Sequence, residues 1–317
     1  MAVTRVLFTT DLHGSDVCFR KFLSAAKIHK ADVLIVGGDT TGKAIVPITQ
    51  EEDGTYKASF FDSDYNARTP KELEDLEAKI SGVGFYSLRL TKEEFEELSK
   101  DDAKLDSIFV ELMRERIRKW IKLAEEHFGD GKHKFLFLPG NDDRFEIDVV
   151  LEESDFAVNP EGKVLYIDDH HEIISTGFSN ITPWNCPRDI PEDKLAEKIE
   201  AMASQLKDVR NSIFCFHVPP YRSKLDLAPK LDDKLQIVHE GGQIVMESVG
   251  SVAVRNSIEK YQPLLGLHGH IHESRAFDRI GRTLCLNPGS EYAEGIFHGA
   301  IVNLDRDSVK GYMLITG

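Results

Sequence analysis

The sequence predicts an α/β fold with a largely parallel sheet that is covered on both faces. Residues 3–9 form a β-branched and aromatic run, and Ser15 follows as a helix cap before apolar residues at helical spacing. The run at 33–36 is continuously apolar, as in strands buried on both faces, and a right-handed crossover would make these two strands parallel. Similar runs lie at 135–138, 173–176, 213–216 and 264–267. The runs at 283–286, 299–302 and 312–315 have no long helices between them, which predicts antiparallel hairpins at the sheet edge.

The stretch between Asp39 and Asn141 is longer than one strand-helix-strand crossover requires. Residues 43–61 predict a β-hairpin around Asp53-Gly54, and Thr69 and Thr91 are expected caps of two helices. A third, long helix is expected to end at Gly129. We therefore interpret residues 1–317 as a single domain in which 43–132 form a hairpin-plus-helices cap insertion. Because this insertion leaves from Asp39 and returns before Asn141, we expect it to shape access to the site.

Composition narrows the classes of partner. The 317 residues are 41% apolar and carry a formal net charge of -15, which argues against wrapping of extended nucleic acid. Small anionic substrates stay possible if bound cations reverse the local field. The sequence has no apolar stretch that could cross a bilayer and no signal-peptide pattern, so we expect a cytoplasmic protein without a membrane partner. The four cysteines are far apart, which indicates neither a zinc knuckle nor a disulfide framework.

Polar residues follow the carboxyl ends of five predicted strands. Each signal alone is weak, because aspartate also caps helices and Gly-Asp and Gly-Asn-Asp are common turns. Ligands of α/β sheets bind beyond the carboxyl ends of strands, and all five signals lie at such ends, so together they predict a metal site. Carboxylate, amide and imidazole ligands suit manganese, iron, nickel or zinc better than calcium. The signals are Asp11-x-His13, Gly38-Asp39, Gly140-Asn141-x-Asp143, His217 and Gly269-His270-x-His272.

As an ordered set, these motifs resemble the calcineurin-like metallophosphoesterase superfamily over nearly the whole chain. The resemblance implies a sandwich of two mixed β-sheets flanked by helices, with two divalent or transition-metal ions that activate a bridging hydroxide for attack on a phosphate ester. It implies that the first metal is bound by Asp11, His13 and His272, that the second is bound by Asn141, His217 and His270, and that Asp39 bridges them.

One position departs from the pattern of that superfamily. Most members have histidine after the metal-binding asparagine, where it contacts the substrate and can protonate the leaving group, but here the residue is Asp142. A carboxylate beside two cations is a poor proton donor at neutral pH, so we expect activity to depend strongly on the leaving group. We assign Asn141 and Asp142 to the catalytic group, and capping of a helix near Arg144 is the alternative role for Asp142.

Three basic residues are candidates for binding the phosphate or the organic part of a substrate. Arg222 and Lys224 follow His217 on a loop stiffened by two prolines, and Arg144 follows the asparagine motif. Ordinary surface charge is the alternative for each of them.

The predicted function is hydrolysis of a small phosphorylated substrate, either a phosphomonoester or a phosphodiester. A non-catalytic metal-binding scaffold for protein interactions is the second hypothesis, which Asp142 favours and the intact ligand set opposes. A nuclease is the third, and it would require a basic groove beside the metals. Hydrolysis of aryl monoesters and diesters after metal reconstitution would separate these alternatives.

Overall fold

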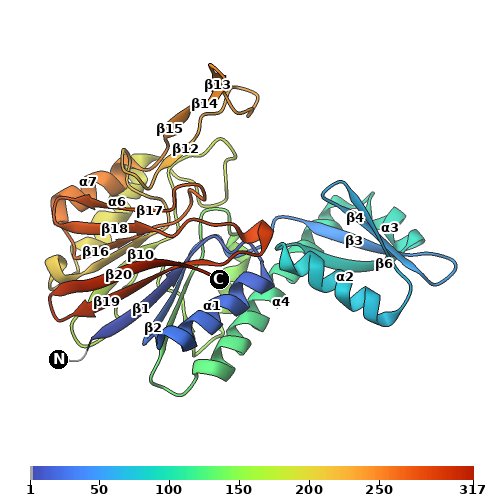
Figure 1. Cartoon of the computed structure of the whole chain (residues 1–317), viewed down its shortest axis with the longest axis horizontal. Coiled ribbons are helices and arrows are strands. Elements are labelled where there is room, and N and C mark those ends of the chain that lie inside the picture. Colours follow the sequence, from blue (N-terminus) through green and yellow to red (C-terminus); the bar gives the residue numbers. More distant parts are fainter. Residues whose placement is uncertain (1–2) are drawn as a thin grey trace.

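Two six-stranded mixed sheets form the centre of the protein (Figure 1). The structure is a computed structural model, and it describes residues 3–317. The first sheet has the order β20-β19-β1-β2-β7-β8, in which β1, β2, β7 and β8 are parallel and the β19-β20 hairpin pairs antiparallel to β1. Its strands are β1 (Thr4–Thr9), β2 (Val33–Gly37), β7 (Lys134–Leu138), β8 (Ala157–Val158), β19 (His298–Asp305) and β20 (Ser308–Thr316).

The second sheet has the order β17-β18-β16-β11-β10-β9. Strands β10, β11, β16 and β18 are parallel, while β9 and β17 run antiparallel at the two edges. The expected edge hairpin of 299–315 is formed by β19 and β20, but the run at 283–286 pairs inside the other sheet, beside β16 and β17. The strands are β9 (Val164–Tyr166), β10 (Glu172–Thr176), β11 (Ile213–Phe216), β16 (Leu265–Leu267), β17 (Ala276–Ile280) and β18 (Thr283–Asn287).

The sheets pack face to face, with helices on both outer faces. Val6 and Phe8 of β1 share a buried apolar cluster with Leu265 and Leu267 of β16, so the inner faces form one core. This packing explains why the strands are continuously apolar in sequence. Alternate side chains of each strand face the other sheet, and those between them contact the helices. Helices α1 (Asp16–His29) and α4 (Asp102–Phe128) cover the first sheet, and α6 (Glu192–Ala203) and α7 (Val252–Tyr261) cover the second. This confirms the helix-flanked sandwich of two mixed sheets.

Register places the expected ligands at one end of the sandwich. Gly37 of β2 pairs with Leu138 of β7, and Thr9 of β1 pairs with Val36, so the carboxyl ends of these three strands are level. In the second sheet, Thr176 pairs with Phe216, and the loops after β11 and β16 begin close together. Short helices lie in the loops on this framework: η1 (Phe145–Ile147), α5 (Asp148–Glu152), η2 (Val209–Asn211) and η3 (Tyr292–Glu294).

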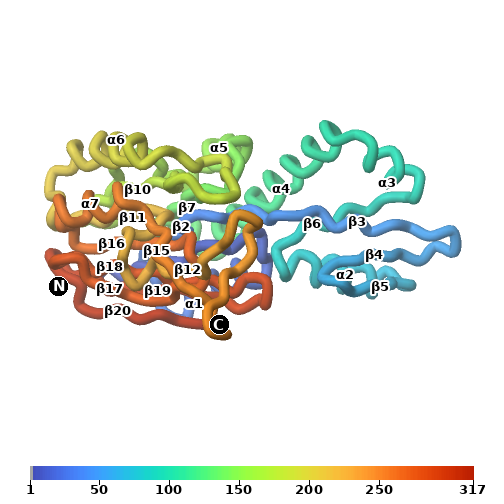
Figure 2. Tube along the Cα trace, turned by 90° about the horizontal axis from the view of Figure 1, so that it is seen from above, coloured from blue at the N-terminus to red at the C-terminus, as the bar shows by residue number. Residues whose placement is uncertain are grey.

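The first part of the segment 43–132 forms a small lobe beside the sandwich, and α4 then returns the chain to the first sheet (Figures 1 and 2). The hairpin expected in 43–61 corresponds to β3 and β4, and two helices begin behind capping boxes at Thr69 and Thr91. The sequence pattern did not predict β5 and β6, so the hairpin is part of a four-stranded sheet of order β5-β4-β3-β6. The lobe contains β3 (Ile45–Gln50), β4 (Tyr56–Phe60), β5 (Ser63–Ala67), β6 (Tyr86–Thr91), α2 (Pro70–Gly82) and α3 (Lys92–Leu98).

A second projection rises from the second sheet (Figure 1). It is an arm of short antiparallel strands, β12 paired with β15 and β13 paired with β14. Within residues 3–317, no helix combines the length and apolar character needed to span a membrane. The strands of the arm are β12 (Leu227–Pro229), β13 (His239–Glu240), β14 (Gln243–Ile244) and β15 (Met246–Ser248).

Candidate metal centre

The expected ligands lie on tight loops directly after the strands. Asp11, Asp39 and His270 have positive φ angles of 54°, 49° and 67°, a conformation that non-glycine residues rarely adopt and that concentrates at functional sites. Gly38 has φ 119°, and a Cβ there would clash with the His217 imidazole, so only glycine permits this approach. The Gly-Gly-Asp motif therefore packs the loop after β2 against the loop after β11.

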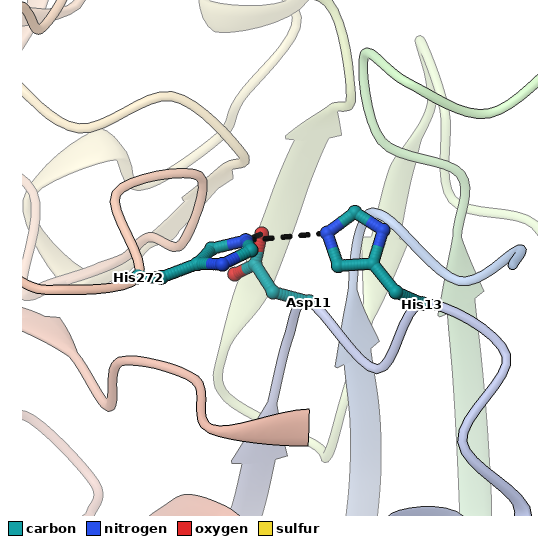
Figure 3. Close-up of side chains that lie close together, drawn as sticks. All are labelled: Asp11, His13 and His272. Atoms are coloured by element: carbon teal, nitrogen blue, oxygen red, sulfur yellow. Dashed lines mark hydrogen bonds and ion pairs between the residues drawn. The ribbon is translucent and has the colours of Figure 1, made fainter. Parts of the chain in front are cut away.

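Asp11, His13 and His272 form one compact group of donor atoms (Figure 3). His272 Nε2 lies 3.4 Å from Asp11 Oδ1 and 3.2 Å from His13 Nε2. The backbone N–H of His270 donates to the Asp11 carboxylate, which ties the first sheet to the loop after β16. These three donors come from both sheets and meet at the shared end of the sandwich.

Asp39, His217 and His270 form a second group beside the first. His217 Nε2 lies 3.3 Å from Asp39 Oδ1. The other ring nitrogen, Nδ1, lies 2.9 Å from the backbone oxygen of Gly37, an arrangement that fixes the ring and leaves Nε2 for a ligand.

Asp39 lies between the two groups. Its Oδ1 faces His217, whereas its Oδ2 lies 3.6 Å from His13 Nε2. Asp39 is also only 4% exposed, so both oxygens are enclosed by the ligand set. A carboxylate with its two oxygens near different imidazoles has the geometry of a bridging ligand.

Asn141 is oriented by Asp189. The Nδ2 amide of Asn141 donates to Asp189 Oδ1 at 2.9 Å, and an ionised carboxylate can only accept, so this bond fixes which end of the amide is nitrogen. The opposite atom, Oδ1, is buried and has no hydrogen-bond partner within residues 3–317. Asp189 thus leaves the amide oxygen available to a cation.

Burial and mutual charge shift the pKa values of the ligand set. Burial lowers the pKa of His13 to about 3 and that of His270 to about 4, which keeps both imidazoles neutral. Burial also acts on His217, but the negative charge of Asp39 outweighs it and raises the pKa to about 9. For Asp39, the burial that would raise the pKa is overcome by the imidazoles, above all His217, and the carboxyl pKa lies well below its ordinary value.

The donor atoms fit a bound cation. Asn141 Oδ1, His217 Nε2 and His13 Nδ1 are buried without hydrogen-bond partners among the described residues. Buried polar atoms without partners cost about 1–3 kcal/mol each. Metal ions would satisfy the first two of these atoms and would neutralise Asp11 and Asp39, and the mixed oxygen and nitrogen donors suit transition metals. The ligand roles remain predictions that this geometry supports.

Asp142 lies at the edge of the ligand set, beside Lys43. Its Oδ2 is 3.1 Å from Lys43 Nζ and 3.8 Å from His13 Nδ1. Burial, followed by the charge of Asp39, raises the pKa of Asp142. The alternative that Asp142 caps a helix finds no support, because Arg144 is the residue at the start of η1 and no side-chain cap bond is formed there.

Asp143 takes a structural role in the same loop. Its carboxylate accepts hydrogen bonds from the backbone N–H groups of Gly140, Thr40 and Thr41 and from both threonine hydroxyls. These bonds hold the loop after β7 against the loop after β2. Asn141 and Asp39 are positioned by this contact.

A cavity of about 1180 Å³ opens onto the ligand set. Arg144 lines it and pairs with Asp106 at 2.6 Å. Arg222 and Lys224 are not among the described residues that line the cavity, and the Arg222 guanidinium lies over the Tyr221 ring instead. The structure therefore brings Arg144 to the site and leaves the other two basic candidates outside its walls.

The insertion contributes little to the walls. From the segment 43–132, the lining residues are Lys43, Phe109 and Met113, and none of residues 44–108, all of which are described, lines the cavity. Access on this side is shaped by α4 rather than by the four-stranded lobe.

Three residues that lie near the ligands were not predicted from the sequence. Lys43 pairs with Asp142, Asp189 orients Asn141, and the Tyr292 ring lies 4.7 Å from that of His13. A signal for Lys43 existed, because it directly follows the Gly-Gly-Asp-Thr-Thr-Gly loop that carries Asp39. Asp189 lies 13 residues after the end of β10 and Tyr292 lies five residues after the end of β18, so neither directly follows a strand.

Comparison with known proteins supports the fold. No family model matches the sequence. A stretch of 155 residues, 48% of this chain, is 32% identical to the uncharacterized protein MJ1162 of Methanocaldococcus jannaschii and spans 62% of that relative's length. The crystal structure of TT1561 of Thermus thermophilus aligns with a TM-score of 0.53 and 17% identity over 100% of this chain and 99% of that chain. Another solved chain aligns with a TM-score of 0.57 and 15% identity over 99% of both chains. These likenesses show a shared fold along the whole chain.

Proposed function

We propose that the chain hydrolyses phosphate esters with two bound divalent or transition-metal ions, as the resemblance of its ordered motifs to the calcineurin-like metallophosphoesterases implies. The observation that carries the proposal is the pair of donor groups on either side of Asp39. One group contains Asp11, His13 and His272, and the other contains His217 and His270, with the oxygen of Asn141 unpartnered nearby among the described residues. Manganese, iron, nickel and zinc all suit these donors.

Two bound ions would activate water near neutral pH and neutralise charge on the phosphoryl group. The chain's own residues then set the geometry. Asp39 lies between the two ligand groups. The bond from the Asn141 amide nitrogen to Asp189 leaves the Asn141 oxygen on the other side, free to bind a metal. The Gly37 carbonyl fixes the ring of His217. These fixed contacts pre-organise the site, so little reorganisation is needed when the ester binds.

Lys43 is the cationic side chain that the chain offers beside the ligands. Its Nζ lies 3.1 Å from Asp142, and about half of the side chain remains exposed to the cavity. From this position the ammonium group would bind a non-bridging phosphate oxygen, while Asp142 holds it in place. Because position 142 carries no histidine, esters with good leaving groups are the expected substrates.

The proposal is tested by reconstituting the protein with manganese, iron, nickel or zinc. p-Nitrophenyl phosphate and bis(p-nitrophenyl) phosphate are then compared as substrates. Metal-dependent release of p-nitrophenolate that Asp39→Ala abolishes supports the hydrolase. Metal binding without turnover of either ester would favour the scaffold instead. The same panel separates monoesterase from diesterase activity.

The nuclease hypothesis requires a basic groove, and the described residues that line this cavity do not provide one. Asp232, Asp233, Glu247 and Glu273 line it, whereas Lys43 and Arg144 are already paired with carboxylates. Such a surface would repel a polyanionic strand.

A further inference from the structure

The outer part of the cavity has two walls with exposed apolar side chains. One wall is the loop after β10, where Ile181 is 53% exposed and Trp184 is 62% exposed. The other is the arm between β12 and β15, where Leu235 is 46% exposed and Ile237 is 44% exposed. Large apolar side chains from two separate segments that remain exposed while lining one cavity indicate a surface that a ligand covers.

The loop that carries Trp184 is fixed to the metal centre. Asp189 Oδ2 accepts hydrogen bonds from the backbone N–H groups of Thr182 and Cys186, while its Oδ1 accepts from Asn141. Trp184 therefore lies on a loop whose two sides are tied to the same carboxylate as a candidate metal ligand. The backbone N–H and the Nε of Arg188 add bonds to the carbonyl oxygens of Asn141 and Asp143, so several contacts hold this loop against the ligand set.

The arm presents Leu235 on an equally defined turn. Asp232 Oδ1 accepts from the N–H groups of Lys234 and Gln236, and Leu235 has a positive φ of 59°. Leucine gains nothing from this backbone conformation, which asparagine or glycine adopts more easily. The turn holds an apolar side chain at a position where local stability favours a polar one.

The charge on these walls is negative. Asp233, Glu247 and Glu273 line the cavity, are exposed, and form no ion pair with any residue of 3–317. They disfavour an organic group that carries further phosphates, carboxylates or sulfonates, and they favour an ammonium group, which also interacts well with the face of an indole ring.

We propose that Trp184 and Leu235 form a binding subsite for the organic part of the substrate. This substrate is an amphiphilic ester with a single phosphate and a bulky apolar group that is neutral or cationic. The inference rests on the proposed function, since it places the phosphate at the ligand set that adjoins these walls. It narrows the substrate from any small phosphate ester to one with a large organic group.

The test measures binding separately from turnover. Non-hydrolysable phosphonates are titrated by calorimetry into the metal-loaded protein: methylphosphonate, naphthylmethylphosphonate, and naphthylmethylphosphonates with a trimethylammonio or a sulfo substituent. Naphthylmethylphosphonate should bind about tenfold more tightly than methylphosphonate, in keeping with burial of part of the naphthyl surface. The ammonio derivative should bind at least as tightly as the neutral one, and the sulfo derivative more weakly.

A fluorescence signal locates the bound ring. The chain has two tryptophans, and Trp120 is 1% exposed and stacked on Phe19. Quenching of the exposed indole by naphthylmethylphosphonate therefore reports on Trp184. Trp184→Ala should remove this quenching and lower the preference for the naphthyl over the methyl ligand.

Leu235→Asn is the second variant, because asparagine tolerates the positive φ and the turn should keep its fold. Ile28→Ala, at a 75% exposed apolar position on α1, is the matched control and should leave the preference unchanged. Equal affinity for methyl and naphthylmethyl ligands, or tighter binding of the sulfo derivative, would overturn the inference. If the naphthyl preference holds but neither p-nitrophenyl ester is hydrolysed with any metal, the subsite stands and the proposed hydrolase fails.

Discussion

Asp189 accepts a hydrogen bond from the side-chain amide of Asn141, and this one contact decides which atom of the asparagine faces away from Asp189. Because the carboxylate offers no donor, the amide nitrogen must point to it, and the oxygen is left without a partner among the described residues. Asp189 also holds the loop of Trp184. The candidate ligand Asn141 and the loop that carries Trp184 are therefore both held by the same carboxylate.

Asp189→Ala should weaken binding of the metal that depends on Asn141. Loss of a group that orients a ligand typically lowers metal affinity about 10–100-fold. Competition between the protein and a calibrated chelator, with metal content by elemental analysis, measures this change. Asp193→Asn, a carboxylate on the following helix, is the control. Unchanged affinity in Asp189→Ala would show that the Asn141 oxygen is not a ligand.

Asp39→Ala should reduce the content of both metals, whereas His272→Ala should reduce chiefly the metal of its own group. Asp39 has one oxygen near His217 and the other near His13, but His272 lies beside Asp11 and His13. Elemental analysis after exhaustive dialysis tests the comparison. A dinuclear centre is contradicted if Asp39→Ala retains two ions per chain.

Lys43→Met should lower kcat/KM for all phosphate esters by roughly 10²-fold, the effect of removing one charged or polar donor from a reacting oxygen. Lys43→Arg should recover part of the loss, because it retains the positive charge beside Asp142. Metal content is measured in parallel and should stay at the wild-type value. A loss of activity that merely follows a loss of metal would show that Lys43 acts through the ligands.

Asp142→His should improve esters with poor leaving groups more than esters with good ones. General-acid catalysis typically contributes about 10²–10⁴-fold where the leaving group needs a proton, and position 142 lies on the wall of the cavity. Rates for a series of aryl esters of increasing phenol pKa are compared at equal metal occupancy. If the substitution changes the rates of all esters by the same factor, residue 142 does not transfer a proton to the leaving group.

Asp168→Asn should destabilise the fold at neutral pH and have little effect in strong acid. Burial would raise the pKa of Asp168, but bonds from the His171 ring, the Thr4 hydroxyl and two backbone N–H groups hold it below its ordinary value. Such a carboxylate stabilises the protein above the pKa of the unfolded chain, and the contribution is lost as pH falls through the folded pKa. With allowance for solvent screening, about 1 kcal/mol is expected at pH 7.

Urea unfolding of wild type and Asp168→Asn at pH 7 and at successively lower pH values measures this difference, which should shrink as the pH falls below the ordinary pKa of aspartate. Asp169→Asn, its neighbour in the chain, is the matched control and should change stability little. If the difference in unfolding free energy between wild type and Asp168→Asn grows as the pH falls, the ionised Asp168 carboxylate does not stabilise the fold.

The sequence by itself identified the candidate ligands at the strand ends, because each one follows an apolar run and parallel strands bring their carboxyl ends together. It also determined the caps at Thr69 and Thr91, which depend on residues three positions apart. Strands β5 and β6 could not be found in this way, since their burial comes from the lobe that they complete. The pairs Lys43–Asp142 and Asn141–Asp189 join residues from distant loops, and Trp184 and Leu235 line the same cavity although 50 residues separate them in the chain. Only the tertiary structure decided these contacts, because no local spacing constrains side chains that the fold brings together from far apart in the chain.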